Sequence, residues 1–198
     1  MPELPEVETV ANHLGNLLIG KKILSATLIR ARLAPHSDTR TFASMLKNAS
    51  VARIHRRGKH ILIDMDNGRT LMVHLRMSGR FMLLADETDE PKFTHARFEL
   101  DNGQKLLFQD QRHFGFMRII ETSEIATAKE LAKLAPEPFS EEFTADYLKT
   151  TASRSTRSLK EFLLDQTKVC GVGNIYASEA MFMAGVNPRM QRSKLTRP

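Results

Sequence analysis

The sequence has one cysteine among 198 residues and no apolar run close to the length of a membrane span. The single thiol, Cys170, excludes an internal disulfide and any zinc site built on several thiolates. The seven histidines show no His-Glu-x-x-His spacing, so we expect neither a metal site nor a cofactor within these residues. A membrane-spanning helix needs ~20 consecutive apolar residues, so we expect no membrane partner.

The sequence also lacks a targeting signal at its start and a composition typical of disorder. It opens Met-Pro-Glu-Leu-Pro-Glu, which is acidic where a signal peptide is basic. The hydrophobic class makes up 41% of the chain, and a chain of this length can bury roughly 70% of its unfolded surface. We therefore expect a folded, cytoplasmic protein.

The charge is basic overall and unevenly distributed. The formal net charge is +6, which permits nucleic-acid binding without establishing it. Residues 1–121 carry 18 Lys and Arg against 14 Asp and Glu, residues 122–149 carry 3 against 6, and residues 150–198 carry 8 against 3. Two basic blocks are thus separated by an acidic segment, and we expect three parts with these boundaries.

The first block reads as one helix followed by strands. Leucine, valine and alanine recur at helical spacing over residues 4–18, and Gly20 follows as a stop signal. Eight short β-rich runs then cover residues 23–30, 51–56, 60–65, 70–75, 80–84, 95–100, 105–109 and 116–120. Asp-Asn-Gly sequences at two boundaries are typical of hairpin turns. This pattern predicts an antiparallel sandwich or barrel.

The strand pattern ends at Thr122, after which the sequence predicts helices. The expected helices cover residues 123–134, 144–150, 158–166 and 174–184. Ser158 and Glu161 have the spacing of a capping box, and Asn174 is the expected cap of the last helix.

Three residues at the start of the chain could carry chemistry. Removal of Met1 gives Pro2 a free secondary amine, and an amine that attacks a sugar C1′ forms an iminium that opens elimination chemistry. Glu3 and Glu6 could then move protons. The alternative is structural, because proline and acidic residues both favour helix starts.

A basic cluster and two loops could contact nucleic acid. In a strand, Arg57 and Lys59 would point the same way, which suits a groove that follows phosphates, whereas most charge runs are merely solvated. Met77 and Phe114 lie beside turn residues and could unstack bases, and Arg112 could fill the hole left by an extruded base. Ordinary core packing is the alternative for both apolar side chains.

The segment Gly171-Val172-Gly173-Asn174 precedes the last expected helix. Glycine-rich backbone amides at a helix N-terminus suit a DNA phosphate. A tight turn between two helices explains the same residues without a ligand, and the choice stays open on these residues alone.

Five segments in this order carry a resemblance to a known family. They are Pro-Glu-Leu-Pro-Glu-Val-Glu-Thr, Arg-Arg-Gly-Lys, His-Leu-Arg-Met-Ser-Gly, Asp-Gln-Arg-His-Phe-Gly and Gly-Val-Gly-Asn-Ile-Tyr-Ala-Ser-Glu-Ala. From Pro2 to about Pro188 the chain resembles the formamidopyrimidine-DNA glycosylases. Leu4 favours this branch over the related endonuclease VIII, which usually has glycine there.

The resemblance implies an α+β fold and a DNA repair activity. The fold is an N-terminal helix plus an eight-stranded antiparallel β-sandwich, followed by a helical helix-two-turns-helix module. The implied enzyme is a bifunctional glycosylase and AP lyase of base-excision repair that removes oxidised purines from damaged double-stranded DNA. It nicks the abasic strand by β,δ-elimination through a Schiff base on the N-terminal proline. We expect a monomer associated with the nucleoid through DNA.

The family's site residues map onto matching positions of this sequence. The implied catalytic residues are Pro2 as nucleophile, Glu3 as general acid/base, Glu6 as supporting carboxylate and Lys59 as a contact to phosphate and lesion. The implied DNA-binding residues are Arg57, Met77, Arg112, Phe114, Lys160, Gly173 and Asn174.

The family normally continues beyond the equivalent of Pro198 for another ~70–80 residues, a size that suits a zinc-stapled module. That module ends in a four-cysteine zinc finger, which Cys170 cannot replace. Loss of its phosphate contacts predicts weaker DNA binding and poorer lesion recognition. Three interpretations follow: a glycosylase/lyase, complete or weakened; a catalytically weak or inactive damaged-DNA-binding protein; and a non-functional fragment of a longer gene.

Overall fold

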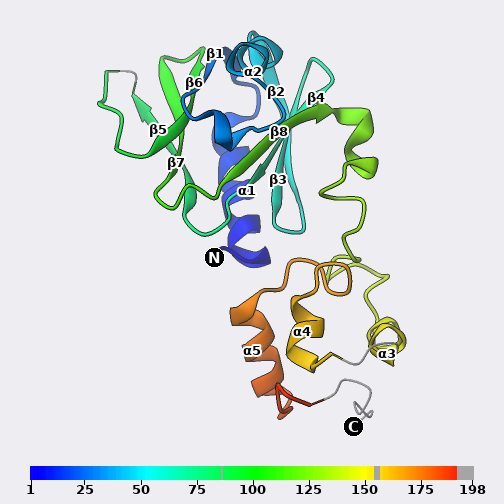
Figure 1. The fold of residues 1–198 in the computed structure, drawn as a ribbon. Helices are drawn as coiled ribbons and strands as arrows, with labels where there is room; N and C mark the ends of the chain where they lie inside the picture. Colours follow the sequence, from blue (N-terminus) through cyan, green and yellow to red (C-terminus); the bar gives the residue numbers. More distant parts are fainter. Residues whose placement is uncertain (86, 154–156, 191–198) are drawn as a thin grey trace. The chain divides into compact units, whose positions relative to one another are not determined.

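A computed structural model describes residues 1–85, 87–153 and 157–190. The chain divides into two compact units, Met1–Ala128 and Lys129–Pro198. The first unit combines helix α1 with a β-sheet, and the second is helical (Figure 1). The division into three parts expected from the charge pattern stays a prediction.

Helix α1 spans Leu4–Leu18, as the apolar spacing predicts. Its buried face consists of Leu4, Val7, Ala11, Leu14 and Leu18. The helix ends at the C-cap Ile19, and Gly20 follows with φ of +82°, a conformation that glycine adopts at no steric cost.

The described residues of the first unit form an eight-stranded sheet in the order β5-β7-β6-β1-β2-β3-β4-β8. The strands are β1 Lys22–Leu28, β2 Ala49–Arg57, β3 His60–Met65, β4 Arg69–His74, β5 Gly79–Ala85, β6 Thr94–Leu100, β7 Gln104–Asp110 and β8 Phe116–Glu121. Every pair is antiparallel. Strands β1 and β2 pair at only two positions, which leaves two four-stranded sections joined at one seam.

The two sections share one apolar core, which confirms the sandwich. The core contains Ile23 and Phe98 from one section, Ile61 and Val73 from the other, and the buried face of α1. The alternation of side chains along each strand directs one face of each section inward.

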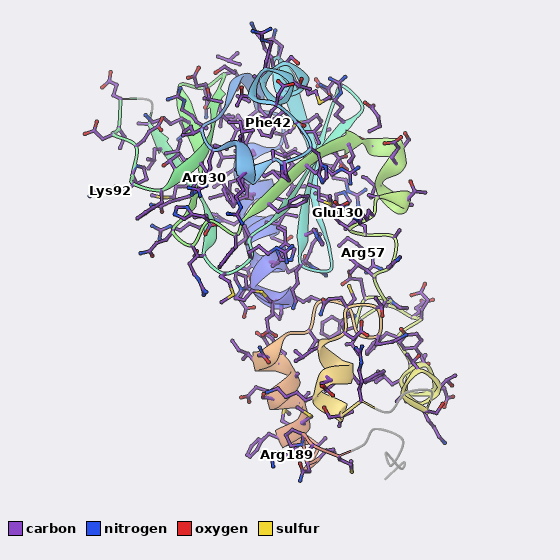
Figure 2. All side chains as sticks on the ribbon, viewed as in Figure 1. Arg30, Phe42, Arg57, Lys92, Glu130 and Arg189 are labelled. Carbon is purple, nitrogen blue, oxygen red and sulfur yellow. The ribbon has the colours of Figure 1, made fainter. Side chains whose placement is uncertain are left out.

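Two short elements in the first unit are absent from the sequence-based expectations. They are the 3₁₀ helix η1 (Ala31–Leu33) and helix α2 (Thr39–Leu46). Asp38 caps α2 by accepting a hydrogen bond from the Thr41 N–H at 2.8 Å. Phe42, labelled in Figure 2, is completely buried and packs against Phe98.

The expectation of a helix over residues 123–134 is wrong. Residues Thr122–Thr127 form the 3₁₀ helix η2, which ends at the C-cap Ala128, and turns follow. The Thr122 N–H donates to the Gly68 carbonyl, which holds this segment against the β3–β4 turn.

The described part of the second unit contains helices α3 (Ala145–Ser153), α4 (Leu159–Leu164) and α5 (Asn174–Met183). A separate apolar cluster holds them together through Ala152, Leu159, Phe162, Ala177 and Met181. The capping box of Ser158 and Glu161 begins α4, as its spacing predicts.

Among the residues that the structure describes, no helix combines the length and apolar character needed to cross a membrane. The same residues contain no group of three or more His, Cys, Asp or Glu side chains placed to hold a metal ion. A four-cysteine zinc finger does not fit this chain, because its sequence has a single, buried cysteine.

Candidate functional site

The start of α1 contains a buried glutamate that directly follows Pro2 in the chain. Glu3 is the N-cap and is only 2% exposed, and Pro2 is half-buried immediately before it. Glu3 and Glu6 form a reciprocal capping box, in which Glu6 Oε2 accepts from the Glu3 N–H at 2.9 Å. Both carboxylates therefore stabilise the start of the helix, and Pro2 lies outside the helix immediately before Glu3.

The hairpin between β2 and β3 lies close to α1. Arg56 Nε donates to Glu8 Oε2 of α1 at 2.6 Å, and Arg56 Nη1 donates to the Gly58 carbonyl at 3.0 Å. The Arg56 side chain is 11% exposed and the Glu8 side chain is 45% exposed, so this ion pair is only partly shielded from solvent. The pair ties the end of β2 to the second turn of α1.

Lys59 lies in this hairpin and is buried, with 6% of its surface exposed. Strand β2 ends at Arg57, which pairs with His60, so Gly58 and Lys59 form a two-residue turn. The expectation that Arg57 and Lys59 share one face of a strand is wrong, because period-two alternation ends where the turn begins. The burial of Lys59 also contradicts a merely solvated charge run at this position.

His74 at the end of β4 is a buried residue that the sequence reasoning did not assign. It pairs with His60 of β3, and the two rings meet edge to face at 4.7 Å. Burial first, and then the charges of His60, Arg76 and Lys59, together lower the pKa of His74 to about 3. His74 is therefore neutral at pH 7, so it adds no positive charge near Lys59.

Two loops present the side chains predicted to enter DNA. Met77 lies in the β4–β5 turn and Phe114 in the β7–β8 loop, and they are 41% and 51% exposed. The core-packing alternative is therefore wrong for both. The Arg112 guanidinium lies 5.4 Å from the centre of the Phe114 ring, within the range of a cation–π contact.

Asp110, at the end of β7, connects these two loops and was not assigned from the sequence. It is 1% exposed, and its carboxylate accepts hydrogen bonds from Ser78 and from the backbone N–H groups of Arg112 and Gly115. The available signal was a lone acid inside the segment Asp-Gln-Arg-His-Phe-Gly, which does not specify burial.

The second unit contains a tight turn that leads into α5. Gly171 has φ of +79°, and its N–H donates to Gln166 Oε1 at 3.0 Å. Gln166 Nε2 in turn donates to the carbonyl groups of Leu164 and Val172. The side chain of Gln166 therefore shapes the turn, which the sequence reasoning missed.

The expected cap of α5 needs a correction. The N-cap is Gly173 rather than Asn174, and no side chain caps it. Asn174 is the first helical residue and is exposed, so its amide is not used for capping. On α4, Lys160 Nζ donates to Ser178 Oγ of α5 at 3.5 Å.

Comparison with known families covers both units. Residues 1–117 match the formamidopyrimidine-DNA glycosylase N-terminal domain, and residues 134–198 match the formamidopyrimidine-DNA glycosylase H2TH domain. The chain belongs to the formamidopyrimidine-DNA glycosylase family. The N-terminal match includes Pro2 and Lys59 and both loops, and the H2TH match includes the Gly171–Asn174 turn.

Similar proteins in this family come from several bacteria. The chain is 38% identical over 196 residues to the formamidopyrimidine-DNA glycosylase of Lactiplantibacillus plantarum, covering 99% of this chain and 71% of that protein. It is 40% identical to the protein of the same name from Streptococcus pyogenes, covering 100% of this chain and 71% of that protein.

Solved structures of the family share the fold. A complex of Lactococcus lactis Fpg with DNA containing an abasic site matches with a TM-score of 0.93 and 30% identity, covering 98% of this chain and 71% of that one. A complex of the same Fpg with FAPY-dG containing DNA matches with the same TM-score and identity, covering 98% and 73%. The likeness extends over both units of this chain.

Proposed function

We propose that this protein is a base-excision-repair DNA glycosylase and AP lyase that acts on oxidised purines in damaged double-stranded DNA. The observation that carries the proposal is that Pro2 lies outside α1 and immediately precedes the buried N-cap residue Glu3. An imino terminus next to a carboxylate can supply both the nucleophile and the proton transfers that such a reaction needs.

The first half of the reaction exchanges one bond to the sugar for another. After removal of Met1, the Pro2 nitrogen attacks C1′ of the damaged nucleotide with its lone pair, and the bond between C1′ and the base breaks. The base leaves with the bonding electron pair and takes up the proton that the Pro2 nitrogen loses. Glu3 delivers a proton to the ring oxygen O4′ as the sugar opens, which leaves an iminium between Pro2 and C1′.

The second half breaks the DNA strand. The iminium withdraws electrons from C2′, so a base removes a proton there and the C3′–oxygen bond breaks with loss of the 3′ phosphate. A second elimination releases the 5′ phosphate, and water hydrolyses the iminium to return the free amine. Glu6 supports Glu3 through the capping box, and buried Lys59 is the cation that we assign to the phosphate beside the lesion.

The two loops and the second unit supply binding to DNA. We assign Met77, Arg112 and Phe114 to the space that the extruded nucleotide leaves in the duplex. Exposure of Met77 and Phe114 and the cation–π contact of Arg112 support this role. Relatives solved with abasic and FAPY-dG DNA are consistent with damaged DNA as the partner.

In the second unit we assign DNA phosphates to the start of α5 and to Lys160. Gly173 and Asn174 present backbone N–H groups at the positive end of the helix dipole, where an anion is stabilised. Lys160 and Arg57 add positive charge that follows the phosphate backbone.

A second candidate is a damaged-DNA-binding protein of the same family with weak or no catalysis. The reciprocal capping box favours it, because it gives Glu3 and Glu6 a structural role that needs no catalysis. Both candidates bind DNA through the same loops, and they differ in whether Pro2 reacts.

Borohydride trapping distinguishes the two candidates. The purified chain is incubated at low salt with a duplex that contains one abasic site, and borohydride reduces any iminium to a stable protein–DNA adduct. The proposal predicts an adduct that disappears when one glycine is added before Pro2. The same glycine added after Pro198 is the matched control and leaves trapping unchanged. Absence of an adduct, with mass spectrometry showing a free Pro2, would support the binding protein instead.

A further inference from the structure

We propose that Asp110 is a positioning residue that joins the β4–β5 turn to the β7–β8 loop, so that Met77, Arg112 and Phe114 are presented to DNA as one preassembled unit. The inference rests on the proposed function, which assigns these three side chains to the space left by the extruded nucleotide. It adds the reason why side chains from two separate loops can enter a duplex together.

The sheet register brings the two loops to the same place. Strand β5 begins at Gly79 and β7 ends at Asp110, and these two residues are paired partners in the antiparallel ladder. The turn before β5 and the loop after β7 therefore leave the sheet side by side. Ser78 precedes Gly79, so its hydroxyl is within reach of the Asp110 carboxylate.

Both oxygens of the Asp110 carboxylate accept hydrogen bonds from residues of the two loops. Oδ1 accepts from Ser78 Oγ at 2.5 Å and from the Arg112 N–H at 3.2 Å, and Oδ2 accepts from the Gly115 N–H at 2.6 Å. The Arg112 N–H also donates to Ser78 Oγ at 3.0 Å. One buried anion therefore contacts the turn that carries Met77 and both ends of the segment that carries Arg112 and Phe114.

The carboxylate is held in its charged form. Burial acts to raise the pKa of Asp110, but the hydrogen bonds from Ser78, Gly115 and Arg112 outweigh burial, so the pKa lies below its ordinary value. Hydrogen bonds to a charged acceptor are stronger than those between neutral groups. Asp110 thus accepts at neutral pH from every donor that faces it.

The loop backbones need such support because each contains a residue in the left-handed region. Arg76 has φ of +55° and His113 has φ of +60°, conformations that are strained for residues other than glycine. His95 Nε2 lies 2.8 Å from the Asp110 carbonyl and 3.0 Å from His113 Nδ1. The carbonyl can only accept, so His95 Nε2 carries the proton and His113 Nδ1 is the second acceptor.

Gly79 and Gly115, the glycines that flank the two loops, both pack closely against the ring of Phe108. A Cβ added at Gly79 would lie 2.7 Å from the Phe108 ring and 2.5 Å from the Leu75 carbonyl oxygen. A Cβ added at Gly115 would lie 2.8 Å from the same ring and 3.1 Å from Asp110 Oδ2. Both loops are therefore anchored on Phe108 and Asp110, and neither can move outward as a rigid body without losing these contacts.

Binding of DNA would otherwise require the protein to order three side chains from two loops at once. Each side chain that is immobilised on association loses conformational entropy and so weakens binding, and preorganisation avoids that loss. The cation–π contact between Arg112 and Phe114 belongs to the same assembly, because Asp110 fixes the backbone on either side of both residues.

The experiment compares Ser78→Ala with the wild-type chain on a duplex that carries a tetrahydrofuran abasic analogue opposite 2-aminopurine. The analogue cannot form an iminium, so binding and unstacking are measured without chemistry. At saturating protein, the wild type is expected to raise 2-aminopurine fluorescence, and Ser78→Ala is expected to give less than half of that rise. Ser78→Thr keeps the hydroxyl and is expected to restore the wild-type signal.

Ser25→Ala is the matched control. Ser25 Oγ donates to Glu99 Oε2 at 2.6 Å in the same unit, so the variant loses the same kind of hydrogen bond away from the loops. A rise that falls equally in Ser25→Ala and Ser78→Ala would overturn the inference, as would a full rise in Ser78→Ala. Failure of the proposed lyase function would instead appear as absence of borohydride trapping by the wild type, while its fluorescence rise remains.

Discussion

Protonation of single buried histidines couples the stability of this fold to pH. His74 is 8% exposed, and burial with the neighbouring His60, Arg76 and Lys59 lowers its pKa to about 3. The unfolded chain takes up this proton near pH 6.5, so between these values the unfolded state binds more protons than the folded state. The contribution of His74 is therefore complete above pH 6.5 and is lost as the pH falls toward 3.

We expect His74→Gln to flatten the acid branch of the stability curve of the first unit. One depressed histidine changes the free energy of unfolding by at most about 1.4 kcal/mol per pH unit, so the wild type should lose about 1–2.5 kcal/mol more than the variant between pH 6.5 and 4.5. His113, whose pKa is also lowered, first by burial and then by Arg30, leaves the variant a residual slope in the same direction.

Urea unfolding at several pH values measures this difference. His13→Gln is the matched control, because it makes the same replacement at an exposed position of α1. Parallel curves for His74→Gln and the wild type between pH 6.5 and 4.5 would contradict the assigned pKa. Asp64 and Asp110, whose pKa values are lowered, affect stability only at lower pH.

The sequence placed Met77 and Phe114 at turns but left open whether they are exposed, and it did not indicate the burial of Lys59. Met77 and Phe114 lie beside Gly79 and Gly115, so the turn positions were visible in the sequence. The burial of Lys59 was not, because it depends on the two-residue hairpin and on neighbours far away in the sequence. The alternation of Arg57 and Lys59 predicted that both residues belong to one strand, whereas β2 ends at Arg57.

At the scale of elements, the eight strands and α1 were predictable because period-two and helical patterns fix which face is buried. Helix α2 was not, because eight residues with only Phe42 and Leu46 buried give too few repeats. The prediction of a helix over residues 123–134 failed because the helical spacing of buried residues is present there without a helix. Ala128, Leu131 and Ala135 are buried at helical spacing, while Thr122 bonds to Gly68 and Thr70 of the sheet.

The turn between α4 and α5 depends on one side chain more than on its glycines. Gln166 makes hydrogen bonds to the N–H of Gly171 and to the carbonyl groups of Leu164 and Val172, and its own carbonyl accepts from the Ala135 N–H. The side chain thus fixes the direction in which α5 begins. The glycine motif alone does not reveal Gln166, because its side chain forms hydrogen bonds with backbone groups both before and after it in the chain.

We expect Gln166→Leu to lower the free energy of unfolding of the second unit by about 1–3 kcal/mol, since backbone groups of the turn lose their partners. Gln166→Glu keeps the acceptor for Gly171 and loses both donors, so its effect should be intermediate. Hydrogen exchange at the Gly171 amide provides the measurement, with fast exchange in Gln166→Leu and slower exchange in Gln166→Glu. Equal protection of the Gly171 amide in the wild type and both variants would show that the turn is stable without the hydrogen bonds of the Gln166 side chain.

At the scale of the whole molecule, the candidate site residues are divided between two units with separate cores. The predicted chemistry belongs to the first unit, through Pro2 and Glu3, and the second unit contributes the predicted phosphate contacts of Lys160 and Asn174. Residues 122–149, which include the end of the first unit, are net acidic, so positive charge concentrates on the two flanking parts. Binding to DNA should therefore depend on individual cations rather than on net charge.

A pair of lysines in the second unit tests this distinction. Lys160 is the second residue of α4, and Lys149 lies exposed on α3, so Lys160→Gln and Lys149→Gln remove the same charge from the same unit. Each phosphate contact contributes about −0.9 to the slope of log affinity against log salt. We expect Lys160→Gln to reduce the magnitude of the slope by about that amount and Lys149→Gln to leave it unchanged.

Fluorescence anisotropy with the tetrahydrofuran duplex between 50 and 200 mM salt, roughly the range over which such contacts are resolved, measures both slopes. Equal slopes for the two variants would mean that Lys160 acts only through net charge, because a cation seated on a phosphate releases a counterion and a distant one does not.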